Sequence, residues 1–357
     1  MLFYDGFFFQ AEDGIRDLVR SRGLGDVYKR QVLSQNIWAR REIPEEDYQE
    51  KIERLQVTAI EEKESLRWLE NLRQVTALLA EPQRCVHIGD RESDIYELFC
   101  TAQELGTNFL VRTCVDRLAG DGGHTIADEM AEVRVQGLHR IEFRGAHGER
   151  CEAQLEIRYR RIRVLPPIGK QKNYPALDLT VLHVQERDAP PQRQPLEWKL
   201  ITNLAVRSKA DAIEKINWYA MRWKIETFHK ILKSGCRAED SRLRTADRLT
   251  NLIAIYCIVS WRIFWMTMLK RPAPDSGPGL AFTDSESEAV DRLQPDRESW
   301  VPQPKTLSRY LTKLAKLGGY LARKTDPPPG NTVVWRGLTR LTDVVLGIRL
   351  ARELVGN

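Results

Sequence analysis

The sequence is poor in the residues that build zinc sites and disulfide frameworks. Its 357 residues include only six cysteines and six histidines. No two cysteines form a Cys-x-x-Cys pair, and no histidine stands at a zinc-ligand spacing from them. Several cysteines lie in apolar runs, where a thiol packs as a small hydrophobic side chain. The pattern excludes a structural zinc module and a disulfide-rich secreted domain, and it fits a reducing cytoplasm.

Long hydrophobic runs and a strong charge of one sign are also lacking. The longest apolar stretch, residues 252–268, is interrupted by Arg262 and is too short to cross a bilayer, so we expect a buried helix and no membrane partner. The net charge is +5, which permits nucleic-acid binding without requiring it. The chain has no internal repeat, and its length allows one large domain or two small ones.

The most informative feature present is a polar stripe in residues 217–235, NWYAMRWKIETFHKILKSG. On one α-helix, Tyr219, Arg222, Glu226 and Lys233 fall within an arc of about 60°. A neighbouring stripe is apolar and docks the helix on a core; its members are Ile213, Ile216, Ala220, Trp223 and Ile231. A carboxylate, two cations and a phenol suit a phosphodiester, because the carboxylate can hold a metal ion and the cations can hold phosphate oxygens. The alternative is a solvated face with i,i+4 ion pairs.

A second motif lies in residues 86–99, VHIGDRESDIYELF. It predicts a short buried strand that Gly89 ends, with Asp90 directly after it and Ser93 as the cap of a following helix. Open α/β sheets place ligands at the carboxyl ends of their strands. Asp90 alone is best interpreted as a loop or capping residue, but together with Glu226 it becomes a candidate metal ligand.

The long interval between Asp90 and Glu226 is rich in strand patterns. Five segments have β-branched and alternating residues: FLVRT, LHRIEFR, CEAQLEIRYRRIRVL, LDLTVLHV and WKLITNL. Trp198 lies in the last of these segments. By pattern alone it is either a core side chain on a sheet or a binding residue.

These motifs together resemble a known family. The spacing Tyr-x2-Arg-x3-Glu-x6-Lys resembles the signature of DDE transposases of the insertion-sequence-four family, of the transposon-five type, and DRESDIYE resembles the family's second-Asp motif. The resemblance implies that Asp90 and Glu226 are the second and third of three carboxylates that hold two Mg²⁺ or Mn²⁺ ions. It also implies phosphate contacts for Tyr219, Arg222 and Lys233.

The resemblance further implies a role for Trp198 and a series of reactions. The tryptophan would stack on a flipped base beside the cleavage site, an interaction that contributes about 1–3 kcal/mol. The expected reactions on DNA are strand nicking, hairpin formation, hairpin opening and strand transfer, with a homodimer in the synaptic complex and a location in the cytoplasm at the nucleoid. Four arginines before the apolar run either track a phosphate backbone or form a solvated face: Arg237, Arg242, Arg244 and Arg248.

The implied fold is α/β, a ribonuclease-H-like core with a β-rich insertion and a helical C-terminal region. We expect the core in residues 32–270, with the insertion at about 105–205. Residues 271–304 are dominated by Pro, Gly, Ser and acids, and predict a flexible linker. Residues 305–357 form the expected helical C-terminal region.

The first 31 residues do not match the rest. They show no helix or strand period, and FFFQAEDGIRD and SRGLGDVYKRQ resemble the translation of sequencing-library adapter DNA. We therefore expect native sequence to begin near Val32. The family's first catalytic Asp precedes the region that residues 38–72 resemble, so we expect it to be missing and the chain to be inactive. Asp47, in a charged loop, has the wrong context to replace it.

Two other functions stay open. One is a non-catalytic DNA-binding or dimerising product that inhibits a full-length transposase. The other is a related ribonuclease-H-like nuclease that cuts DNA without joining it.

Overall fold

The structure is a computed structural model that divides the chain into two compact units, Met1–Arg222 and Trp223–Asn357. It describes residues 65–78, 81–144, 150–235, 241–269, 273–296 and 304–355, together with the short antiparallel pair β1 (Leu2–Phe3) and β2 (Trp38–Ala39). The expectations about residues 1–31 and about Asp47 fall almost entirely outside the described residues.

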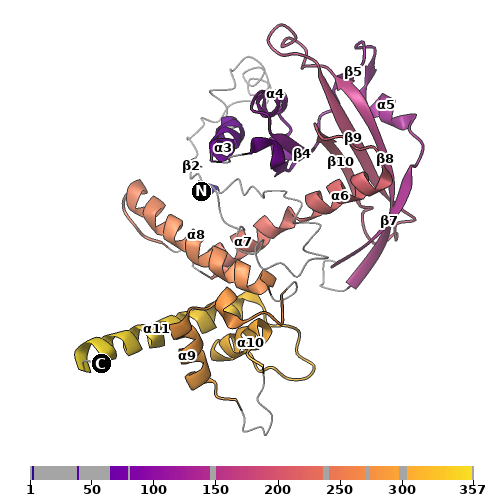
Figure 1. Ribbon diagram of the computed structural model, residues 1–357. Helices are drawn as coiled ribbons and strands as arrows, with labels where there is room; N and C mark the ends of the chain where they lie inside the picture. The colour runs from indigo at the N-terminus through magenta and orange to yellow at the C-terminus, as the bar shows by residue number, and fades with distance from the viewer. Residues whose placement is uncertain are drawn as a thin grey trace. The chain divides into compact units, whose positions relative to one another are not determined.

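The first unit is built on one eight-stranded sheet, drawn from indigo to pink in Figure 1. Its strands are β3 (Val86–Gly89), β4 (Asn108–Arg112), β5 (Leu118–Ala119), β6 (His124–Thr125), β7 (Gly137–Arg144), β8 (Arg150–Val164), β9 (Leu177–Arg187) and β10 (Glu197–Thr202). Its helices are α3 (Leu66–Ala77), α4 (Tyr96–Glu104), α5 (Ile126–Ala131) and α6 (Lys209–Ala220), with 3₁₀ turns η2 (Pro82–Arg84) and η3 (Arg91–Ser93).

The sheet joins the expected core to the expected insertion. Its order is β3-β4-β10-β9-β8-β5-β6, with β7 on β8. β3 and β4 are parallel, and every other described pair in this sheet is antiparallel. The five strand patterns of the sequence are confirmed as β4, β7, β8, β9 and β10. Because β4 pairs with β3 on one side and with β10 on the other, the insertion extends the core sheet instead of forming a separate one.

Each face of the sheet carries its own hydrophobic cluster, because successive side chains of a strand point to opposite faces. On β9, Val181 belongs to the cluster shared with α3, α4 and α5, whereas Leu182 belongs to the cluster shared with α6. On β10, Ile201 belongs to the first of these clusters and Leu200 to the second. Helix α6 therefore covers one face of the sheet (Figure 1), and the other three helices cover part of the opposite face.

The second unit is helical. It contains α7 (Trp223–Ser234), α8 (Ala246–Leu269), η5 (Pro278–Leu280), α9 (Asp284–Leu293), α10 (Leu307–Leu317) and α11 (Asn331–Val355). The α/β class with a ribonuclease-H-like core, a β-rich insertion and a helical C-terminal region is confirmed. The segment 271–304, in contrast, is not simply a linker: Thr283 forms a capping box with Glu286 and begins α9.

Helix α8 is the apolar stretch noted in the sequence. By length and composition it is the one helix among the described residues that could cross a membrane. It packs on α7 and α11 and buries Ile253, Ile263 and Phe264, as expected for a core helix. Ile255 and Ile258 remain exposed on its other side.

Candidate active site

Asp90 stands directly after β3, as the sequence predicted. Its Oδ1 accepts a hydrogen bond from the Glu92 backbone N–H at 3.0 Å, so it caps the 3₁₀ turn η3. Gly89 is required before it, because a Cβ at this position would overlap the Ser93 hydroxyl. The prediction that Ser93 caps the next helix is wrong. Ser93 lies inside η3 and donates its hydroxyl to the Asp90 carbonyl at 2.8 Å, whereas α4 begins only at Tyr96.

A second aspartate of the same motif, Asp94, braces this turn. Its side chain is fully buried, and Oδ2 accepts hydrogen bonds from the Thr113 hydroxyl and from the Cys114 and Val115 backbone N–H groups at 2.8, 2.8 and 3.0 Å. Arg117 forms an ion pair with Oδ1 at 2.7 Å and donates to the Asp94 carbonyl at 2.9 Å. Asp94 thereby fastens the loop after β4 to the loop after β3, at the carboxyl ends of the two parallel strands.

The single helix predicted for residues 217–235 is interrupted. Helix α6 ends at Ala220, Met221 caps it, and α7 starts at Trp223. At this point the Arg222 N–H donates to the Tyr219 carbonyl, three residues earlier, at 2.9 Å. This is the hydrogen-bond spacing of a 3₁₀ turn. Tyr219 and Arg222 therefore close the first unit, while Glu226 and Lys233 belong to the second.

Three of the candidate residues come together with Asp90 in the first unit. Arg222 Nη1 lies 3.9 Å from Asp90 Oδ2, and the Arg222 guanidinium lies 6.0 Å from the centre of the Tyr219 ring. The Tyr219 ring in turn meets Trp198 edge-on, with centroids 5.5 Å apart. Tyr219 is only 5% exposed and Trp198 is half-buried against the same cluster under α6, so both aromatic rings are also packing residues. Tyr219, a member of the predicted polar stripe, is thus buried in this contact.

The other two candidates share one face of α7. Glu226 lies in its first turn and Lys233 in its last, and both are exposed. Seven residues on a helix make nearly two full turns, which places them about 10 Å apart along the axis. Between them, burial and the nearby Lys233 lower the pKa of His229, while Glu226 acts in the opposite direction. Trp223, which the sequence placed in the core, is 48% exposed.

The basic residues before α8 are only partly described. Arg242, Arg244 and Arg248 are exposed, and Arg237 lies outside the described residues. Their exposure is compatible with either interpretation that the sequence allowed.

Comparison with protein families matches two models along the chain. The model described as "Transposase DDE domain" matches residues 66–262, which is more than half of the chain. The chain belongs to the DDE transposases. A second model, "Transposase Tn5 dimerisation domain", matches residues 258–356, and the two together identify the transposon-five-like type. The resemblance drawn from the sequence motifs is confirmed.

Membership in this family implies the use of divalent metal ions, DNA binding and dimer formation. In the part of the chain that the structure describes, no group of three or more His, Cys, Asp or Glu side chains is placed to hold a metal ion. The transposase does offer suitable donors one by one, since Asp90 and Glu226 present carboxylate oxygens, which Mg²⁺ and Mn²⁺ prefer. Asp90 is half-buried at a strand end and Glu226 is exposed, so both carboxylates fit such a role.

Sequence reasoning missed the brace formed by Asp94 and Arg117. The signal was present in the motif, because DRESD contains a second aspartate four residues after Asp90. Nothing in the sequence indicated that its partners would come from the loop after β4.

Proposed function

We propose that this chain is the catalytic-core portion of a transposase that cuts and joins DNA strands at transposon ends. Asp90 and Glu226 supply two of the carboxylates that hold Mg²⁺ or Mn²⁺ ions. The observation that supports this most directly is the Asp90–Arg222 pair at the carboxyl end of β3, which sets a carboxylate beside a cation where α/β sheets bind ligands.

Each remaining candidate has a role in this proposal. Arg222 and Lys233 neutralise the phosphate oxygens, Tyr219 donates its hydroxyl to one of them, and Trp198 stacks on a base. A metal ion at the carboxylates would activate water or a 3′-hydroxyl and stabilise the leaving oxygen. With only two carboxylates assigned, we propose that this chain alone binds the metal weakly and does not cleave DNA.

The dimer is assigned to the C-terminal helix. On α11, the exposed leucines Leu346, Leu350 and Leu354 repeat every four residues and form an apolar stripe within the segment that matches the dimerisation model. Two copies of this stripe can cover each other. The same observation supports the alternative of a non-catalytic product that binds DNA and inhibits a full-length transposase in the cytoplasm.

The test combines DNA binding with cleavage. We expect Arg222→Ala and Lys233→Ala each to weaken binding to duplex DNA several-fold and to reduce the slope of log affinity against log salt by about one, as for a lost phosphate contact. The control Lys324→Ala removes an exposed cation elsewhere in the second unit and should change neither quantity. Fluorescence anisotropy at several salt concentrations measures both.

The cleavage arm uses supercoiled plasmid with Mg²⁺ and then Mn²⁺. We expect no nicking above the level of the Asp90→Asn variant. Nicking that Asp90→Asn abolishes would contradict the proposed inactivity, and cut products without joined ones would identify the nuclease. Unchanged DNA affinity in both cation variants would contradict the phosphate roles.

A further inference from the structure

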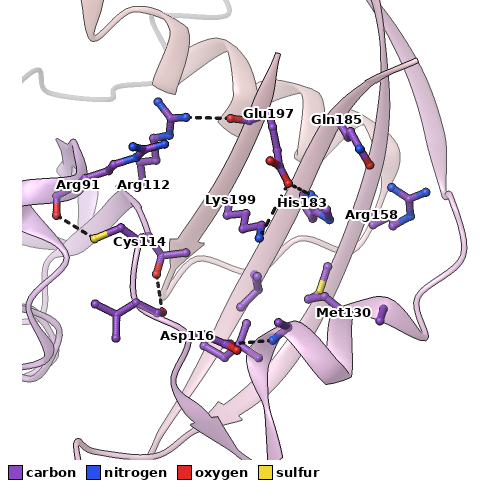
Figure 2. A pocket seen from close by; sticks show the side chains of 16 residues that line it. Arg91, Arg112, Cys114, Asp116, Met130, Arg158, His183, Gln185, Glu197 and Lys199 are labelled. Atoms are coloured by element: carbon purple, nitrogen blue, oxygen red, sulfur yellow. Dashed lines mark hydrogen bonds and ion pairs between the residues drawn. The ribbon is translucent and has the colours of Figure 1, made fainter. Parts of the chain in front are cut away.

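A pocket on the first unit adjoins the turn after Asp90, because Arg91 lines it, but it contains none of the candidate site residues. It encloses about 640 Å³ between the end of β4, its following loop, helix α5 and strands β8, β9 and β10 (Figure 2). Its position follows from the alternation along β10. Glu197 and Lys199 line the pocket, whereas Trp198 between them packs against Tyr219 of α6 on the other face. The pocket therefore opens on the sheet face opposite Trp198 and Tyr219.

The walls of the pocket are cationic. Lys199 on β10 stands opposite His183 on β9, and His183 stands opposite Arg158 on β8, so the three side chains form one row across three strands. With strands about 4.8 Å apart, the row is about 10 Å long. Arg91 and Arg112 extend the positive charge toward the end of β4, as Figure 2 shows.

The acids that line the pocket offset only part of this positive charge. Four cations, Arg91, Arg112, Arg158 and Lys199, face two carboxylates, Asp116 and Glu197. Asp116 Oδ1 accepts from the Ala127 backbone N–H at 2.9 Å, and Glu197 Oε1 lies 2.8 Å from His183 Nε2. Arg158 is paired with Glu156 at 3.0 Å, and Lys199 Nζ lies 3.9 Å from Glu197 Oε1. With Glu156 counted, four cations face three carboxylates, and the net positive charge is one.

Most of the other lining residues are apolar, and this restricts the kind of anion that the pocket can bind. Ile126, Met130 and Val181 are buried and, with Ala127, supply aliphatic surface beside the cations. Gln185 adds an exposed amide that can donate and accept. A ligand that matches all three features carries a phosphate, a hydrogen-bonding edge and a flat apolar body. The volume lies in the range of pockets that enclose ligands of that size.

We propose that this pocket binds a nucleoside phosphate, as a free nucleotide or as one unit of a DNA strand. The phosphate lies on the row formed by Lys199 and Arg158, and the base packs on Ile126 and Met130. The site is separate from the phosphate contacts proposed for Tyr219, Arg222 and Lys233. It stands or falls independently of them.

Cys114 provides a reporter inside the pocket. It is the exposed member of the cysteines that the structure describes, and its thiol donates to the Arg91 carbonyl at 3.6 Å. Burial and the nearby Asp94 raise the pKa of this thiol, so alkylation is run at alkaline pH. Mass spectrometry of the peptide that contains Cys114 gives its rate of alkylation by iodoacetamide.

The experiment compares protection of Cys114 by thymidine 5′-monophosphate, by a short oligothymidylate and by thymidine. We expect both phosphate compounds to slow alkylation at least fivefold and thymidine to have little effect. If the oligonucleotide protects at far lower concentration, the source is a DNA strand; equal protection identifies a free nucleotide. Inorganic phosphate that protects as well as the nucleotide would overturn the nucleotide assignment.

Two variants test where the protecting ligand lies. Lys199→Ala should raise the protecting concentration at least fivefold, whereas Lys172→Ala, an exposed lysine outside the pocket, should leave it unchanged. Protection that needs no higher concentration in Lys199→Ala than in the unaltered chain would overturn the proposal, as would no protection by any nucleotide.

Discussion

At the scale of single residues, Asp94 shows how the candidate active site is held. A carboxylate and a guanidinium that are both almost fully buried lose the solvation of two charges, which only excellent geometry can offset. Here three hydrogen bonds reach Oδ2 and the Arg117 guanidinium stacks over the Phe99 ring at 5.3 Å. The pair therefore fixes the turn that carries Asp90.

We expect Asp94→Asn to destabilise the protein by about 3–5 kcal/mol, because it leaves the Arg117 charge buried without its partner. The matched control is Glu104→Gln, an exposed carboxylate at the end of α4, whose effect should stay within about 0.5 kcal/mol. Urea denaturation followed by circular dichroism gives both values. Equal effects of the two substitutions would show that the buried pair adds nothing.

At the scale of secondary-structure elements, two glycines set the approach of α10 and α11. Gly318 follows α10 and Gly337 lies in α11, and a Cβ on either would overlap backbone atoms of the other segment. Both glycines lie in the segment GGYLARKTDPPPGNTVVWRGL, residues 318–338. Its glycines allow two helices to pack backbone against backbone.

We expect Gly337→Ala to destabilise the helical unit by about 1–3 kcal/mol, because the added methyl collides with the Leu314 carbonyl. Gly347→Ala is the matched control on the same helix, since a Cβ there meets nothing within 4 Å. The control should stabilise by up to about 1 kcal/mol, because alanine favours the helix more than glycine does. Thermal unfolding of both variants measures the two changes in melting temperature. Shifts of the same sign in both would contradict the close packing of α10 on α11.

Elements were predictable from sequence where a local pattern specifies them. The alternation of β7 to β10 and the acid after β3 were of this kind. Helix α9 was missed, although Thr283 and Glu286 match the capping-box spacing, because the Pro- and Ser-rich composition around them outweighed it. The turn at Met221 and Arg222 contains neither Pro nor Gly and had no local signal. The burial of Tyr219 depends on Trp198, a residue from a strand that only the folded sheet brings to it.

At the scale of the whole molecule, buried titratable groups make stability depend on pH. His87 lies on β3 with Nε2 3.0 Å from the Thr107 hydroxyl, and burial lowers its pKa from 6.5 to about 3. For Asp291, burial raises the pKa, but hydrogen bonds from Tyr310, Lys313 and Lys305 outweigh it and lower the value from 3.8 to about 2. In both cases the unfolded chain takes up a proton before the folded one, so acid favours unfolding.

We expect stability to fall between pH 6.5 and pH 3 by about 1.4 kcal/mol per pH unit from His87 alone. Asp291 adds its share only as the pH falls from about 4 toward 2. His87→Gln should remove the His87 contribution, whereas His124→Gln, at an exposed site, should leave the slope unchanged. Urea midpoints at pH 6, 5 and 4 measure the slope, and an unaltered slope in His87→Gln would contradict the assignment.

The place of β4 between β3 and β10 also governs the order in which the chain can fold. The strand at Asn108–Arg112 finds its second partner only at Glu197–Thr202, roughly 90 residues later along the chain. During synthesis the edge of β4 therefore stays uncovered until the whole β7–β9 meander has left the ribosome. Such distant pairings close slowly. A polypeptide that ends before β10 would present the open edge of β4 to other chains. The pairing that makes the sheet continuous would then lead to aggregation.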